Sequence, residues 1–197
     1  EYAHRLLARF IGLFFLLPFL FFIFIKFLKK EMIIKLSYVF ALILFQGIIG
    51  WYMVQSGLIE NITVSHYRLS IHLLIAFSIL TSLIWILLSS INKTKKKFFQ
   101  INTSHLLLKF LLILLFIQII LGAFVSGLDA GKIYQTWPLM NGKYYPDDIY
   151  VNSFFNFDNP SFVQFIHRNI AYLIFLVSIL LGLNIYKRKD LNVFRCF

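Results

Sequence analysis

Five apolar runs dominate the sequence, each close to the length at which a helix crosses about 30 Å of hydrocarbon, roughly 20 residues. They cover Leu6–Leu28, Ile33–Val54, Leu69–Ser89, Leu106–Val125 and Phe162–Tyr186. Hydrophobic residues make up 60% of the chain and charged residues 14%, which excludes an ordinary soluble domain. Because backbone groups in hydrocarbon need partners within the segment, helices are favoured. The sequence therefore predicts an all-α integral membrane protein with five transmembrane helices.

The charged residues divide the connections between these runs into two kinds. Lysines and arginines cluster between the first and second runs, between the third and fourth, and after the fifth. The other two connections are poor in lysine and hold the acidic residues Glu60, Asp129, Asp147, Asp148 and Asp158. By the positive-inside rule, the basic connections face the cytoplasm or matrix. The net charge of +11 is thus explained by topology, and nucleic acid is not an expected partner.

Histidines collect at the outer ends of the predicted helices, which hold His4, His66, His72 and His167, while His105 begins the fourth run on the inner side. An ionisable residue within a membrane span suggests a functional site. For one histidine alone, the simpler explanation is that polar residues gather at helix ends. Two of them, however, enter their runs in the same way, as Glu1-Tyr2-Ala3-His4-Arg5 and Gln164-Phe165-Ile166-His167-Arg168.

The chemistry that imidazole pairs permit in a helical bundle is axial ligation of haem iron. His4 and His72 lie on runs with the same direction and can approach one pocket from opposite walls. His66 is six positions before His72, about 240° around a helix, so at most one of the two faces that pocket. We take His72 as the ligand. Arginines near these histidines are candidates for haem propionates, with snorkelling to the membrane interface as the alternative: Arg5, Arg68 and Arg168.

Glu1 precedes His4 by three residues, on nearly the same helix face and about 4.5 Å away along the axis. A carboxylate there would reach the rim of a porphyrin held by His4, where it could exchange protons or stabilise positive charge. Gln164, at the equivalent position of the second motif, cannot titrate. The difference predicts one reactive site and one site that only carries electrons. The alternative is that Glu1 simply caps the helix start.

A second repetition links the second and fourth runs, where Gln46 and Gly50 correspond to Gln118 and Gly122. Small residues at such positions let membrane helices approach closely. The connection that follows, 126–161, is long enough to act as a functional lid.

The motifs together resemble the heme A synthase family, membrane enzymes that convert heme O to heme A for cytochrome oxidase, and in particular its alpha-proteobacterial and mitochondrial type. The resemblance covers the chain to about Tyr186. The matching segments are Glu1-Tyr2-Ala3-His4-Arg5, Trp51-Tyr52-Met53-Val54-Gln55-Ser56-Gly57-Leu58, Tyr67-Arg68-Leu69-Ser70-Ile71-His72-Leu73, Gly127-Leu128-Asp129-Ala130-Gly131, Thr136-Trp137-Pro138-Leu139-Met140 and Gln164-Phe165-Ile166-His167-Arg168.

The resemblance implies a pseudo-symmetric pair of four-helix bundles. Residues 1–92 would supply three helices on the substrate-haem side, and residues 93–197 two helices on the resident-haem side. It further implies that His4 and His72 bracket the substrate, heme O, and that His167 ligates a resident haem b. Glu1 would take part in oxidising a ring methyl to a formyl group. The implied partners are the lipid bilayer, heme O synthase and cytochrome oxidase assembly factors, and oligomerisation is open.

Two alternatives stand beside this interpretation: a di-haem membrane electron carrier of the b type, and an inactive remnant. The chain offers only five of the eight expected spans, so it is expected to be a fragment or a truncated product, with the second ligand of the His167 haem outside it. Composition rich in Lys, Ile and Asn favours a bacterial inner membrane, with the mitochondrial inner membrane as the alternative.

Overall fold

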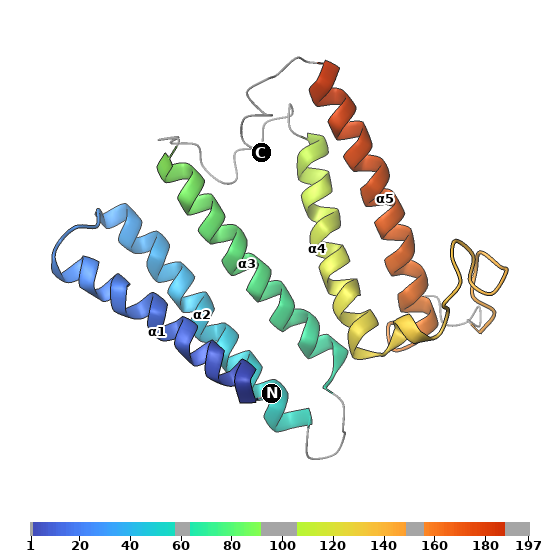
Figure 1. Ribbon diagram of the computed structural model, residues 1–197, viewed down its shortest axis with the longest axis horizontal. Helices are drawn as coiled ribbons and strands as arrows, with labels where there is room; N and C mark the ends of the chain where they lie inside the picture. Colours follow the sequence, from blue (N-terminus) through green and yellow to red (C-terminus); the bar gives the residue numbers. More distant parts are fainter. Residues whose placement is uncertain (1, 58–63, 92–105, 149–155, 188–197) are drawn as a thin grey trace. The chain divides into compact units, whose positions relative to one another are not determined.

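The computed structural model describes residues 2–57, 64–91, 106–148 and 156–187 (Figure 1). Within these ranges the chain forms α1 (Tyr2–Phe24), α2 (Lys30–Gly57), α3 (His66–Ile91), α4 (Leu106–Gly127), the short 3₁₀ helix η2 (Ala130–Lys132) and α5 (Pro160–Lys187). All five α-helices are long and apolar enough to cross a membrane. The prediction of an all-α membrane protein with five transmembrane helices is therefore confirmed.

α1 ends at Phe24, whereas the sequence predicted that this helix would continue to Leu28. Lys26 takes a left-handed conformation with φ 54°. Its N–H bonds to the carbonyl of Ile23 at 3.0 Å, and that of Phe27 bonds to the carbonyl of Phe22 at 3.0 Å. This pair of bonds is a Schellman motif, and the rings of Phe22 and Phe27 supply its hydrophobic contact with centroids 5.4 Å apart. The motif stops the helix although the apolar run continues.

The chain divides into two compact units, residues 1–97 and 98–197, which we describe separately. In the first unit α2 packs against both α1 and α3. Aromatic stacking contributes to the first of these contacts, because the rings of Phe15 and Phe40 lie 6.0 Å apart and nearly parallel. The assignment of the units to two haem-binding bundles stays a prediction.

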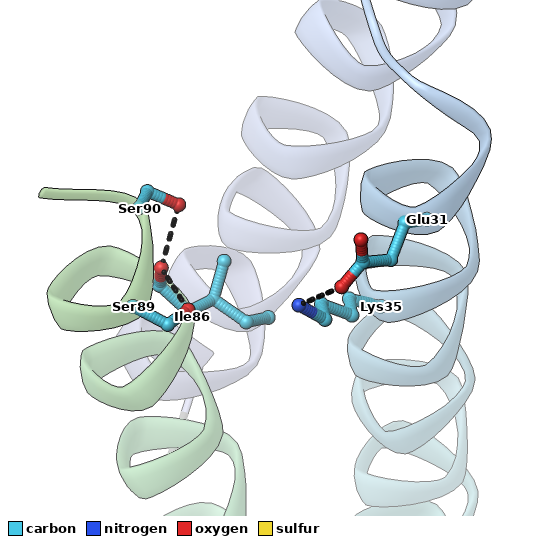
Figure 2. Close-up of polar contacts among 5 residues, drawn as sticks. All are labelled: Glu31, Lys35, Ile86, Ser89 and Ser90. Atoms are coloured by element: carbon cyan, nitrogen blue, oxygen red, sulfur yellow. Dashed lines mark hydrogen bonds and ion pairs between the residues drawn. The ribbon is translucent and has the colours of Figure 1, made fainter. Parts of the chain in front are cut away.

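Short-range contacts occupy the polar side chains where α2 begins and α3 ends (Figure 2). Lys35 donates to Glu31 one turn earlier at 2.8 Å. The hydroxyls of Ser89 and Ser90 both donate to the carbonyl of Ile86, at 2.9 and 2.7 Å. Such bonds satisfy serine hydroxyls on an apolar helix without a partner on another helix. The hydroxyls of Ser89 and Ser90 thus bond within α3, and Lys35 bonds within α2.

In the second unit α4 packs along α5, and both helices contact η2 (Figure 1). Asn159 caps α5, since its Oδ1 accepts from the N–H of Phe162 at 3.1 Å, and Pro160 takes the first helical position that suits it. Farther back along the chain, Met140 and Lys143 exchange backbone hydrogen bonds of 2.7 and 3.2 Å around a two-residue turn. We call residues 134–148, which include this turn, the strap.

Candidate functional site

His72 lies in the second turn of α3 with its ring against α2. A Cβ built on Gly50 would lie 3.1 Å from Cε1 of His72, so the absence of a side chain at Gly50 makes room for the ring. The ring Nδ1 is buried and has no hydrogen-bond partner among the described residues. Buried polar atoms nearly always have partners, so this nitrogen marks a place where a ligand or a changed contact is to be expected.

His4 lies near the start of α1 and is exposed on the protein surface. Its ring is close enough to that of His72 for a charge on one to act on the other. The structure thus brings the two predicted ligands to the same end of the first unit. Imidazole nitrogens are good ligands for iron. The pair, with the unpartnered Nδ1 of His72, fits an iron porphyrin in its donor chemistry.

Arg68 connects two helices of this unit. It lies one turn before His72 on α3, and its Cζ lies 4.8 Å from the centroid of the Tyr52 ring on α2. This is a cation–π contact of ordinary length. A guanidinium that stacks by its face still donates hydrogen bonds from its edge, which is how arginine combines packing with recognition of carboxylates. The predicted role of Arg68 toward a propionate stays a prediction, as does that of Arg5, which is exposed on α1.

His167 on α5 repeats the arrangement around His72. A Cβ on Gly122 of α4 would lie 3.5 Å from Cε1 of the His167 ring. One turn earlier on α4, Gln118 Nε2 lies 3.2 Å from the ring Nε2 and 3.2 Å from the carbonyl oxygen of His167. The ring Nδ1 and Gln118 Oε1 are buried without partners in the described part of the chain. Sequence reasoning noted the Gln and Gly pair but not that it faces a histidine.

Gln164 and Arg168 bind the strap. The Gln164 carboxamide accepts from the Tyr134 N–H at 3.2 Å and donates to the Tyr134 carbonyl at 2.9 Å, as a neighbouring strand would. Arg168 donates to the carbonyls of Thr136 at 2.8 Å and Tyr134 at 2.6 Å. Gln164 is only 4% exposed. The residue that sequence reasoning assigned to an electron-carrying site therefore has a local structural task.

Tyr134 and Asp148 join the strap to the start of α5. The Tyr134 hydroxyl donates to Asp148 Oδ1 at 2.8 Å, and the hydroxyl of Ser161 donates to Asp148 Oδ2. Burial and the hydrogen bond to Asp148 raise the pKa of Tyr134 above its usual value. Partial burial acts to raise the pKa of Asp148, but the hydrogen bonds from Ser161 and Tyr134 outweigh it and hold that pKa below its usual value. No periodicity or motif in the sequence pointed to this network.

Three further residues complete the comparison with the sequence predictions. Glu1, the predicted catalytic carboxylate, and His105 lie outside the described residues. His66 is the first residue of α3 and is 8% exposed, with its ring centroid 4.1 Å from that of Tyr67. His66 is thus more buried than His72, and its ring packs against that of Tyr67. The preference for His72 over His66 as the ligand stays a prediction.

Comparison with known families decides what kind of protein this is. The model of the COX15-CtaA family, described as cytochrome oxidase assembly protein, matches residues 1–195. The chain belongs to the COX15-CtaA family. The resemblance found in the sequence motifs is confirmed by relatives that carry the name heme A synthase.

Relatives of this family are similar along almost the whole chain. The heme A synthase of Pelagibacter ubique is 49% identical over 194 residues, 96% of this chain and 56% of the relative. Those of Wolbachia pipientis from Culex pipiens and of Rickettsia bellii are each 42% identical, covering 98% and 96% of this chain and 59% and 58% of the relatives. The chain thus spans somewhat over half the length of these relatives. No solved structure matches it.

Proposed function

We propose that this chain forms part of a heme A synthase, a membrane oxidoreductase that converts heme O to heme A by oxidising a ring methyl to a formyl group. The observation that carries the proposal is the His72 ring packed over Gly50 with a buried Nδ1 that has no partner among the described residues, together with the electrostatic interaction between His72 and His4. The names of the similar proteins support the same activity and favour it over a di-haem electron carrier.

In this proposal His4 and His72 would hold heme O through its iron, and His167 would hold a resident haem b. When bound, the iron porphyrin supplies the redox chemistry. The residues of the chain orient it: imidazoles fix the plane of the ring, and arginines neutralise the propionates. These arginines are Arg5, Arg68 and Arg168.

Glu1 is the proposed catalytic residue. Three residues before His4, its carboxylate would act at the porphyrin rim, where it accepts a proton or stabilises positive charge during oxidation of the substituent. A haem held by His167 would supply a route for the electrons released in this oxidation. The bacterial relatives favour an inner-membrane location, with heme O synthase and cytochrome oxidase assembly factors as the partners that supply substrate and receive product.

Haem analysis of the purified chain tests the proposal. The protein is made in cells that synthesise heme O, purified in detergent, and its extracted haems are separated by chromatography. We expect His4→Ala and His72→Ala to lose the haem of the first unit, because removal of one axial ligand leaves a single imidazole. His66→Ala is the matched control, since it makes the same change on α3 outside the proposed pair. Unchanged haem content in His4→Ala and His72→Ala would contradict the assignment.

The role of Glu1 has a separate test in the same cells. We expect Glu1→Ala to keep bound haem but to leave it as heme O, because the ligands remain and the proton acceptor is gone. Formation of heme A by this variant at the rate of the unchanged protein would remove Glu1 from the mechanism. A chain that binds haem and makes no heme A at all would instead support the electron-carrier alternative.

A further inference from the structure

Gln118 is bound to His167 at two atoms, one on the backbone and one on the ring. Its Nε2 lies 3.2 Å from the His167 carbonyl oxygen and 3.2 Å from the His167 ring Nε2. Both contacts cross from α4 to α5 within the second unit. A single amide group therefore determines both where this part of α5 packs and how the imidazole is turned.

The backbone contact fixes which way the carboxamide points. A carbonyl oxygen can only accept a hydrogen bond, so it must face the NH₂ group of Gln118 and not Oε1. The same NH₂ group then faces the ring Nε2. Since an NH₂ group only donates, the ring Nε2 must supply a lone pair. In a neutral imidazole the proton then lies on the other nitrogen, Nδ1.

We propose that Gln118 is a positioning residue that holds His167 with its Nε2 lone pair available and covers that lone pair until a metal takes it. The inference rests on the proposed function, in which His167 is a haem ligand. A neutral imidazole binds iron through the nitrogen that lacks the proton, and the hydrogen bond of the other nitrogen usually sets which one that is. In His167 the hydrogen bond from Gln118 is made to Nε2, the nitrogen that would bind the metal, and not to Nδ1.

The second hydrogen bond of Gln118 makes this arrangement reversible. When iron binds the ring Nε2, the amide loses its contact with the ring but keeps the contact with the His167 carbonyl. The side chain therefore needs no new partner for its NH₂ group on metal binding. Its Oε1 and the ring Nδ1 of His167, both buried without a partner in the described residues, remain the groups with an unmet hydrogen bond.

The tautomer of His167 in the metal-free protein tests the proposal directly. Two-bond ¹H–¹⁵N correlations of the labelled, haem-free chain in lipid nanodiscs report which ring nitrogen carries the proton. We expect the proton of His167 on Nδ1. In Gln118→Leu, which has similar volume and no donor, the proton should move in part to Nε2. Gln46→Leu is the matched control on α2 and should leave the His167 signals unchanged. A proton on Nε2 in the unchanged protein, or no change in Gln118→Leu, would overturn the proposal.

A second variant keeps the test decisive if Gln118→Leu does not fold. Gln118→Glu retains the shape, but its carboxylate accepts where the amide donates. It therefore loses the bond to the His167 carbonyl and favours a proton on the ring Nε2. We expect that proton in the same spectra, and haem affinity at His167 lowered by about tenfold, because a hydrogen bond to a charged group must be broken first. Equal affinity would count against the proposal. If the unchanged protein binds no haem while its tautomer is as expected, the proposed function fails and the role of Gln118 stands.

Discussion

In the α2/α3 pair and in the α4/α5 pair, a histidine on one helix packs against a glycine on the other, which also carries a glutamine. The two pairs differ in the contacts that the glycine and the glutamine make. In each, a glutamine and a glycine one turn apart lie on the earlier helix, and the glycine faces the ring of a histidine on the later one. A Cβ on Gly50 would approach its ring to 3.1 Å, against 3.5 Å on Gly122. In the second unit Gln118 bonds to the ring, whereas in the first the Oε1 of Gln46 is buried without a described partner.

The difference teaches that one residue pattern supports two ways of holding a ligand. In the first unit the ring of His72 packs closely over Gly50, and its buried Nδ1 has no hydrogen-bond partner among the described residues. In the second, hydrogen bonds from Gln118 set both position and tautomer of His167. We interpret the first as suited to a substrate that enters and leaves, and the second as suited to a cofactor that stays.

The largest expected effect comes from giving the second motif the acidic residue of the first. Gln164→Glu keeps the bond from the Tyr134 N–H but places a carboxylate against the buried Tyr134 carbonyl. The lost donor should destabilise the attachment of the strap by about 2 kcal/mol, or about 30-fold in the population of the detached strap. Trypsin cleavage after Lys143, which lies in the strap and is exposed, should accelerate by that factor.

The control for this experiment is Gln135→Glu, which makes the same change at an exposed position of the strap. Its cleavage rate should stay within about twofold of the unchanged protein. If Gln164→Glu were cleaved no faster than Gln135→Glu, the carboxamide of Gln164 would not be what holds the strap, and the contrast between the two motifs would need another cause.

A smaller effect should separate the two glycines. Replacing glycine by alanine within a helix stabilises it by about 0.5–1 kcal/mol through the unfolded chain and the helix propensity. At Gly122 the new methyl would meet His167 at an ordinary contact distance, so Gly122→Ala should keep most of this gain. At Gly50 the methyl would be too close to the His72 ring, so Gly50→Ala should lose this stabilisation. The measurement is the free energy of unfolding in mixed detergent micelles.

Gly47→Ala is the matched control on α2, because a Cβ there meets nothing within 4 Å. It isolates the helix propensity from the contact with the ring. Equal stabilisation by Gly50→Ala and Gly47→Ala would show that the His72 ring yields without cost, and the distinction between the two units would weaken.

The smallest effect concerns the pH dependence of the strap in the second unit. The pKa of Asp148 is lower in the folded protein than its usual value of 3.8, so its contribution to stability is present above that pH and is lost as pH falls through the folded pKa. Because the carboxylate is exposed, the contribution should be under about 1 kcal/mol. Amide hydrogen exchange of the strap, corrected for its intrinsic rate, should rise as pH falls below 3.8.

Two variants check the origin of this pH dependence. Ser161→Ala removes one hydrogen bond to Asp148 and should make the rise smaller, because less of the pKa depression remains. Asp147→Asn removes the neighbouring carboxylate, which pairs with Lys143 at 2.7 Å on the surface, and should leave the rise in place. The reverse order of these two effects would assign the pH dependence to Asp147.

The helices could be predicted from the sequence because membrane length and apolar content are summed over about 20 residues and tolerate local irregularity. Helix ends could not, because they depend on single conformations. The end of α1 is set by the left-handed conformation of Lys26, a position where glycine would have been the usual sequence signal. α3 begins at His66, three residues before its apolar run, because a helix continues through polar residues at a membrane interface.

The candidate site could be predicted in part. The spacing of the two histidines predicted that both lie near the starts of their helices, which is where α1 holds His4 and α3 holds His72. The contact between Gln118 and His167 depends on how α4 and α5 are rotated about their axes, which two uniformly apolar helices do not encode in their periodicity. The task of Arg168 in binding the strap depends on backbone carbonyls, which have no sequence signature.

The attachment of the strap has a consequence for the order of synthesis. The side chains that hold it, Ser161, Gln164, Arg168 and Asn169, all follow it in the chain. When the strap leaves the ribosome, the carbonyls of Tyr134 and Thr136 still lack these partners, and they exchange water for the side chains of Gln164 and Arg168 only after α5 has been made. In a nascent chain arrested before α5, the strap would therefore be unattached and sensitive to proteases. The strap can attach only after the helix that carries His167 has been translated.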